Sequence, residues 1–192
     1  MEYLVLGLIL FLGVHSVRIV AEGWRSRMVE RMGAMPFKAV YSIVSVVGFG
    51  LIIWGFGQAR QTPVLLWVAP VGLRHALSLL NLVGFVLLVA AYIPNNFFKA
   101  RFHHPMILGV KSWALAHLLV NGFVAQLVLF GSFLVWAVAD FIAARRRDRL
   151  QGTVYAPANT TATVVTVALG VGAWAVFAFV LHGMLIGNRP FG

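Results

Sequence analysis

The sequence contains no cysteine and very little charge. Among its 192 residues charged side chains make up only 10%, whereas soluble domains average about 25%. The absence of cysteine excludes disulfides, iron–sulfur clusters, thiolate zinc sites and covalently attached haem. Histidine, present six times, is therefore the main side chain able to bind a transition metal.

Apolar sequence fills most of the chain. Hydrophobic residues make up 61% of it, and the mean hydropathy is +0.91. A helix needs about 20 apolar residues to cross a bilayer, at about 1.5 Å per residue. We predict an all-α integral membrane bundle of about six transmembrane helices, forming one domain over residues 1–192. The predicted spans are residues 4–20, 39–56, 75–93, 105–121, 123–144 and 162–186.

Three connecting segments are too polar or too short to span. Residues 22–38 are rich in charge and are predicted to continue the first helix along the membrane interface, stopping near Gly33 and Pro36. Residues 58–72 contain two prolines and are predicted to form a loop that dips into the interface. Residues 151–161 are predicted to be a polar linker.

The net charge of +10 could indicate nucleic-acid binding, but the basic residues flank the apolar spans. With the N-terminus outside, only three basic loop residues lie outside, namely Arg60, Arg74 and Arg189. Ten lie inside: Arg25, Arg27, Arg31, Lys38, Lys99, Arg101, Arg145, Arg146, Arg147 and Arg149. This bias predicts that both termini are outside and that the partner is the lipid bilayer, not nucleic acid. The run 145–149 is interpreted as a stop-transfer flank, with an acidic-lipid contact as the alternative.

The segment from Arg101 to Gly122 carries the densest set of polar side chains in an apolar context. Pro105 suits the first turn of a helix, because its missing N–H would be unbonded there. Asn121-Gly122 predicts the helix end, since glycine is comfortable at positive φ. The residues between are mostly apolar, so the segment is predicted to cross the membrane.

Two polar stripes follow this helix. Trp113, His117 and Asn121 share one face at a spacing of four, and His104 and Lys111, seven apart, form a second. Polar groups inside hydrocarbon are costly, so both stripes require partners or a function. Lys111 could also extend its ammonium towards lipid phosphate.

The first span carries a polar stripe of its own, formed by His15, Arg18 and Glu22. One interpretation is structural, with an Arg18–Glu22 ion pair and a histidine bonded to a neighbouring helix. The other is a shared site with His117. If the first helix continues to Arg25, His15 lies about 15 Å and His117 about 18 Å from the inner charges, at 1.5 Å per residue. If it ends near Glu22, the two levels differ by about two turns.

Five sequence motifs together resemble the NnrU family, and the resemblance covers nearly the whole chain. They are His15-Ser16, the run from His104-Pro105 to His117, Asn121-Gly122, Leu129-Phe130-Gly131-Ser132 through Trp136, and Leu185-Ile186-Gly187. The family is bacterial, multi-pass and associated with nitrite and nitric oxide reduction in denitrification. The resemblance implies the inner membrane as the location.

A relative of that family, the plant and cyanobacterial 15-cis-ζ-carotene isomerase, carries a b-type haem held by two histidines. By position in the motifs, these ligands fall on His15 and His117. The resemblance therefore implies non-covalent haem b with both as metal ligands. Trp113 and Asn121 would support His117, and Arg18 would neutralise a propionate, with Lys111 as the alternative.

The family's fold is also similar to that of integral-membrane methyltransferases, which carry an Arg-His-Pro motif near the cytoplasmic face. The matching residues here read His103-His104-Pro105. Histidine in place of arginine weakens the inference of S-adenosylmethionine binding. His75, His103 and His182 lie near the ends of spans and receive no role beyond contacts to lipid headgroups.

Three functions remain open at this point. The first is a membrane haem protein of denitrification, with redox or nitric oxide chemistry at iron. The second is a haem-dependent isomerase acting on an apolar polyene. The third is a non-catalytic assembly or electron-transfer partner of nitric oxide reductase components.

Overall fold

The computed structural model describes residues 1–191, without the side chains of Val71, Arg74, His75 and Ala76. The one role considered for His75, a headgroup contact, therefore lies outside the described residues. Helices are the regular elements of the described chain, joined by irregular connections, with one isolated bridge between Leu65 and Phe123. The helices are α1 (Glu2–Val20), α2 (Glu22–Met32), α3 (Ala34–Ala59), α4 (Val71–Tyr92), α5 (Phe97–Phe102), α6 (Pro105–Val120), α7 (Val124–Gln151), α8 (Thr160–Val176), the π-helix η1 (Phe177–Leu181) and α9 (His182–Ile186).

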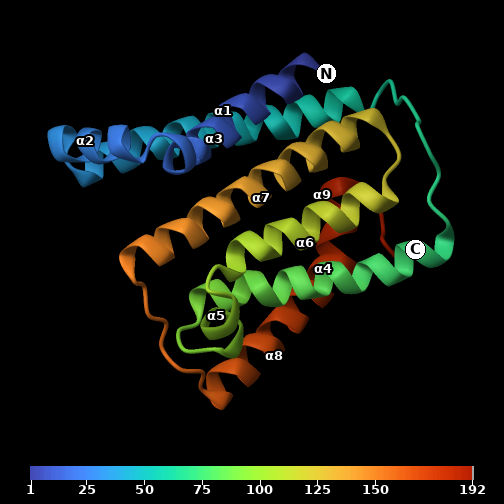
Figure 1. Cartoon of the computed structure of the whole chain (residues 1–192). Coiled ribbons are helices and arrows are strands. Elements are labelled where there is room, and N and C mark those ends of the chain that lie inside the picture. Colours follow the sequence, from blue (N-terminus) through green and yellow to red (C-terminus); the bar gives the residue numbers. More distant parts are fainter. Residues whose placement is uncertain (192) are drawn as a thin grey trace.

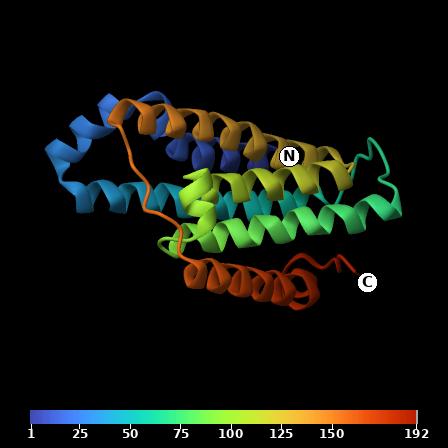
Figure 2. The ribbon, with the colours of Figure 1, turned by 60° about the horizontal axis from the view of Figure 1, so that its bottom comes forward.

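The long helices pack side by side in an order that differs from their order in the sequence. Each contacts the next in the series α3, α1, α7, α6, α4 and α8 (Figures 1 and 2). α6 and α7 are antiparallel neighbours, as the tight turn at Asn121-Gly122 predicts. They lie in the middle of the series. The main core forms among α1, α3 and α7 and consists of Leu4, Leu8, Ile52, Ala59, Ala125, Leu129 and Phe130.

Glycines bring two helix pairs into close contact. A Cβ at Gly48 of α3 would lie 2.8 Å from the backbone nitrogen of Phe11 in α1. A Cβ at Gly109 of α6 would lie 2.9 Å from the carbonyl oxygen of Gly84 in α4. Apolar surface gives little driving force between helices in lipid, so close backbone packing of this kind supplies much of their attraction.

Four helices are long and apolar enough to cross a membrane: Glu2–Val20, Ala34–Ala59, Val124–Gln151 and Thr160–Ile186, where the last includes the π-helical turn. Two further apolar stretches, Leu77–Tyr92 and Pro105–Val120, are shorter. A 16-residue helix such as Pro105–Val120 is about 24 Å long, against a hydrocarbon core of about 30 Å. Helices thus occupy all six predicted segments, while the count of six spans stays a prediction.

The two ends of the bundle differ in charge. One end holds α2, α5 and the last turns of α7, which carry nearly all of the ten basic residues assigned to the inside; the other holds both termini and the 60–70 connection (Figure 1). The segregation on which the topology depends is therefore present in three dimensions. Which end faces outward stays a prediction.

One local expectation was wrong. The segment 22–38 does not continue the first helix, because Ala21 leaves helical geometry at φ −139° and ψ 38° and α2 starts anew at Glu22. Glu22 is favoured there by the helix dipole and pairs with Arg25. The segment before Pro105 contains the short helix α5, capped by Asn96, whose buried side chain accepts from the N–H of Lys99. The expected stop at Gly33, with φ 86°, is confirmed.

Candidate functional site

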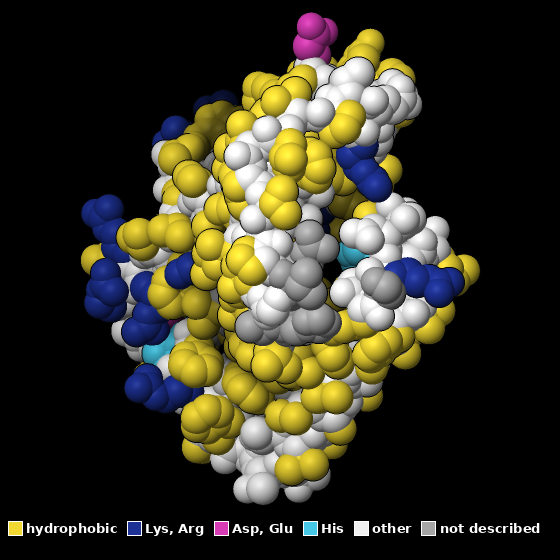
Figure 3. Space-filling model, turned by 90° about the vertical axis from the view of Figure 1, so that its right-hand side faces the viewer, with side chains coloured by type: hydrophobic (Ala, Val, Ile, Leu, Met, Phe, Trp, Pro, Cys, Tyr) yellow, Lys and Arg dark blue, Asp and Glu magenta, His cyan; other side chains and the backbone are white. Residues whose placement is uncertain are grey.

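A cavity of about 1020 Å³ opens at the end of the bundle that holds both termini. Figure 3 views this end and shows a hollow with a histidine side chain inside it and basic side chains near its rim. The walls come from α4, α6 and the α8–η1 helix, and the 62–69 connection and the C-terminal segment close it partly from outside. Aromatic and aliphatic side chains dominate the walls, including Phe85, Leu88, Trp113, Phe133, Trp174 and Phe177. Such a cavity is typical of sites for apolar ligands.

The roof of the cavity depends on the turn between α6 and α7. The Leu66 N–H donates to the Gly122 carbonyl at 2.7 Å, and the Val124 N–H donates to the Val64 carbonyl at 3.0 Å. A Cβ at Gly122 would overlap the carbonyl oxygen of Trp67. Glycine is therefore required here for close approach and not for the positive φ that the Asn-Gly pattern suggested, since Gly122 is not among the positive-φ glycines.

The stripe of Trp113, His117 and Asn121 faces this cavity, which confirms the predicted grouping. The His117 Nδ1 lies 2.9 Å from the Trp113 carbonyl oxygen. Because a carbonyl can only accept, Nδ1 carries the proton and Nε2 keeps its lone pair. Asn121 donates to the His117 carbonyl at 2.8 Å, and Gln126 donates to the Asn121 side-chain oxygen at 3.2 Å.

Among the described residues, two amide oxygens of the cavity lining have no hydrogen-bond partner. They are Oε1 of Gln126 and Oδ1 of Asn81, both buried. A buried acceptor left unpaired costs about 1–3 kcal/mol. The cavity thus offers two acceptors to hydrogen-bond donors of a ligand or of water.

His182 also lines the cavity, and the sequence had suggested only a headgroup contact for it. Its Nδ1 lies 2.6 Å from the Asn188 carbonyl oxygen, so this imidazole too keeps its Nε2 lone pair. A signal for it existed in the sequence. Trp174, Ala178 and His182 recur at a spacing of four, and all three line the cavity.

His15 lies in a different place, between α1, α3 and α7. Its ring stacks on Phe11 at a centroid distance of 4.3 Å and contacts Tyr41 and Trp136 at 5.1 and 6.1 Å. Its Nδ1 is 2.6 Å from the Phe11 carbonyl oxygen. The residue is thus in an aromatic setting, on the far side of Phe133 from the cavity.

His15 of α1 and His117 of α6 do not line the same cavity: His117 is among the lining residues and His15 is not. Both helices pack against α7, where His15 lies beside Trp136 and His117 beside Phe130. Six residues of helix separate those two contacts, which is about 9 Å along the axis. The break at Ala21 agrees with this offset. It ends the first helix near Glu22, the case in which His15 and His117 are expected at different depths in the membrane. A relay of rings, Phe11 to Phe133 at 5.8 Å and Phe133 to Trp113 at 5.4 Å, connects the two regions.

Arg18 is exposed and lies away from the cavity lining. Its Nε is 3.7 Å from Glu22 Oε2, which confirms the ion pair of the structural interpretation. Among the described side chains, Arg60 and Arg189 are the arginines that line the cavity. Arg60 also donates to the Ile186 carbonyl at 2.9 Å, holding the C-terminal segment over the cavity.

The second stripe of α6 faces α7. Lys111 places its ammonium 4.9 Å from the ring centroid of Phe141, and the ring of His104 lies 6.3 Å from the same phenyl group. A cation over an aromatic face is favourable by about 0.5–2 kcal/mol. Lys111 thus has a protein partner within the bundle.

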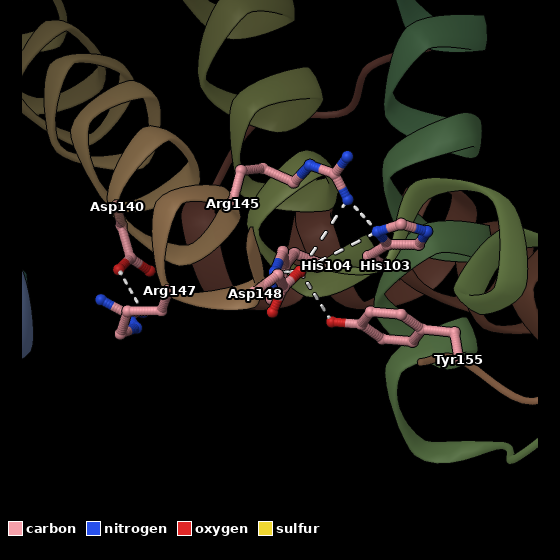
Figure 4. A network of polar contacts seen from close by, with 7 residues as sticks. All are labelled: His103, His104, Asp140, Arg145, Arg147, Asp148 and Tyr155. Carbon is pink, nitrogen blue, oxygen red and sulfur yellow. Dashed lines mark hydrogen bonds and ion pairs between the residues drawn. The ribbon is translucent and has the colours of Figure 1, made fainter. Parts of the chain in front are cut away.

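A polar cluster joins the α5–α6 turn, the end of α7 and the following linker (Figure 4). Asp148 accepts from His104 at 2.8 Å and from the Tyr155 hydroxyl at 3.0 Å. Arg145 donates to His103, and His103, held at φ 69°, stacks on Tyr155 at 4.1 Å. The histidine that replaces the arginine of the methyltransferase motif therefore has protein partners.

The electrostatics of this cluster keep the Tyr155 hydroxyl protonated. Burial, together with the hydrogen bond to Asp148 and its negative charge, raises the pKa of Tyr155 to about 12. The phenol remains a donor at neutral pH, which suits the carboxylate it faces. We regard the cluster as a clasp that fastens the linker to the inner end of the bundle.

A family model described as NnrU protein matches residues 3–190. No curated protein and no solved structure matches the chain. The match covers the clasp and nearly all of the cavity lining, and the chain belongs to the NnrU family.

Proposed function

We propose that this protein is an integral membrane haem b protein in which His117 binds the iron and the cavity holds the macrocycle. One observation carries the proposal: an imidazole with its Nδ1–H bonded to a backbone carbonyl presents Nε2 to a large, aromatic-walled cavity. Neutral imidazole is the commonest protein ligand of haem iron, and a carbonyl on Nδ1 orients it for that role.

The rest of the lining suits the two halves of a haem. The porphyrin plane is apolar and would lie against walls such as Trp113, Phe85 and Phe177. Its propionates are anionic and would be neutralised at the mouth by Arg60 and Arg189. These two arginines therefore replace Arg18 in the role proposed from the sequence. When bound, the haem supplies an iron that changes redox state and binds small molecules such as nitric oxide.

The role we propose for that iron follows the association of the NnrU family with nitrite and nitric oxide reduction. A haem site in the inner membrane would serve denitrification by redox or nitric oxide chemistry. A non-catalytic contribution to the assembly of, or electron transfer to, nitric oxide reductase components would use the same site.

A second candidate is a haem-dependent isomerase of an apolar polyene. The observation that favours it is the number of apolar side chains in the walls, among them Leu77 of α4, Trp113 of α6 and Phe177 of η1. An elongated hydrocarbon would be held by such a surface. A shift of the haem absorption bands on adding a carotenoid precursor would support this candidate over the first.

The test is the absorption spectrum of protein expressed with a haem precursor and purified in detergent. We expect wild type to carry close to one haem per chain, and His117→Ala to lose the haem or to change its spectrum. Lys111→Met is the matched control, because Lys111 lies on the same helix but faces Phe141; its haem content should equal that of wild type. A haem-free wild type, or a His117→Ala spectrum equal to that of a loaded wild type, would overturn the proposal.

A further inference from the structure

Two imidazoles from different helices line one cavity. His117 projects from α6 and His182 from the first position of α9. Each has its Nδ1 hydrogen bonded to a backbone carbonyl, at 2.9 and 2.6 Å, so each keeps the Nε2 lone pair for a ligand. A bis-histidine iron site needs two imidazoles on one cavity, each with a ring nitrogen left for the metal, and this pair meets that condition.

The backbone around His182 is specialised. The α8 helix changes to π geometry over Phe177–Leu181, immediately before this histidine. A π-helical turn holds more residues than an α-helical one and so rotates the side chains that follow it, and such turns occur frequently at functional sites. Trp174 and Phe177, on either side of the change, line the same cavity as His182.

The C-terminal segment supports the orientation of His182. Gly187 turns the chain back at φ 75°, which brings the Asn188 carbonyl onto the imidazole. Arg60, from the end of α3, donates to the Ile186 carbonyl and holds this turn in place. The imidazole thus has a built support from a helix more than a hundred residues away in the sequence.

We infer that His182, and not His15, is the second iron-binding imidazole of the cavity. The inference rests on the proposed function, because it concerns the same haem. His15 makes the same kind of hydrogen bond, from Nδ1 to the Phe11 carbonyl. It is not among the residues that line the cavity, and its neighbour Phe11 contacts the lining residue Phe133. His15 therefore serves as the matched control for an imidazole of equal chemistry in the wrong place.

The experiment compares wild type, His182→Ala and His15→Ala, each loaded with hemin and purified in detergent, by visible absorption and electron paramagnetic resonance. We expect wild-type iron to be six-coordinate and low-spin, with sharp reduced bands. His182→Ala should become five-coordinate and high-spin, and added imidazole should restore the low-spin spectrum. His15→Ala should keep the wild-type spectrum. Helical content by circular dichroism shows that each variant is folded, and imidazole rescue separates a lost ligand from a lost support for the C-terminal turn.

The outcomes separate the inference from the proposal beneath it. A haem-free wild type would remove the proposed function and the inference together. A loaded wild type that is already five-coordinate, or a folded His182→Ala that stays low-spin, would overturn the inference and leave His117 as a ligand. A high-spin His15→Ala beside an unchanged His182→Ala would assign the second position to His15.

Discussion

At the scale of single residues, the same histidine chemistry serves two different purposes in this chain. His117 and His182 line a cavity and bond to backbone carbonyls through Nδ1, whereas His103 and His104 bond to Arg145 and Asp148 in the clasp. The difference lies in what surrounds the ring. Charged partners take up the imidazoles of the clasp, while the cavity histidines contact carbonyls and aromatic rings, which leave one nitrogen available.

The Tyr155 hydroxyl gives the clasp a pH dependence that can be measured. Tyr155→Phe removes one hydrogen bond to a carboxylate and should lower stability at neutral pH by about 1–2 kcal/mol. The pKa of Tyr155 is raised in the fold, so its contribution is present below the unfolded value near 10 and is lost as the pH rises towards about 12. The difference in thermal midpoint between wild type and Tyr155→Phe should therefore shrink above pH 10. Tyr92→Phe, at an exposed site, should match wild type throughout; equal midpoints for Tyr155→Phe at pH 7 would refute the clasp.

At the scale of helices, glycine positions decide which neighbours approach closely. The α4–α6 pair meets at Gly84 and Gly109, where a Cβ on either residue would press on the other's carbonyl oxygen. Gly131 of α7, in contrast, has open space where its Cβ would be. Gly109 and Gly131 look alike in the sequence, since each is a glycine within an apolar helix.

Alanine at these two positions should act in opposite directions. In Gly109→Ala the new methyl group meets the Gly84 carbonyl at 2.9 Å, and overpacking of this kind costs about 1–3 kcal/mol. In Gly131→Ala no neighbour is displaced, and the higher helix propensity of alanine should add up to about 1 kcal/mol. Thermal unfolding in detergent, followed by circular dichroism, measures both. A stabilised Gly109→Ala would mean that the α4–α6 contact is looser than described.

Element-level features were predictable to the extent that they depend on local sequence. The six apolar segments, the helix start at Pro105, the stop at Gly33 and the Trp113–His117–Asn121 stripe all follow from periodicity and turn chemistry. The break at Ala21 was missed, because alanine is a good helix former and nothing local marks it. That His182 and His117 line the same cavity was missed for another reason. It depends on which helices are neighbours, since both α6 and α8 pack against α4.

At the scale of the whole molecule, charge and cavity occupy opposite ends. The clasp and most of the arginines lie at the end with α2 and α5, and the cavity opens at the end with both termini. If the basic end is cytoplasmic, as the positive-inside bias predicts, the cavity opens towards the periplasm. Small substrates or electron donors would then reach it from that side.

Reporter fusions test this orientation directly. A reporter active only in the periplasm, fused after residue 192, should be active, and the same reporter fused after Gly152, beside the arginine run of α7, should be inactive. The physical reason is that ten of the basic loop residues sit at one end and resist translocation. A reporter active only in the cytoplasm should give the reverse pattern at both sites. An inactive periplasmic fusion at the C-terminus together with an active one after Gly152 would invert the bundle, and with it the side from which the cavity is reached.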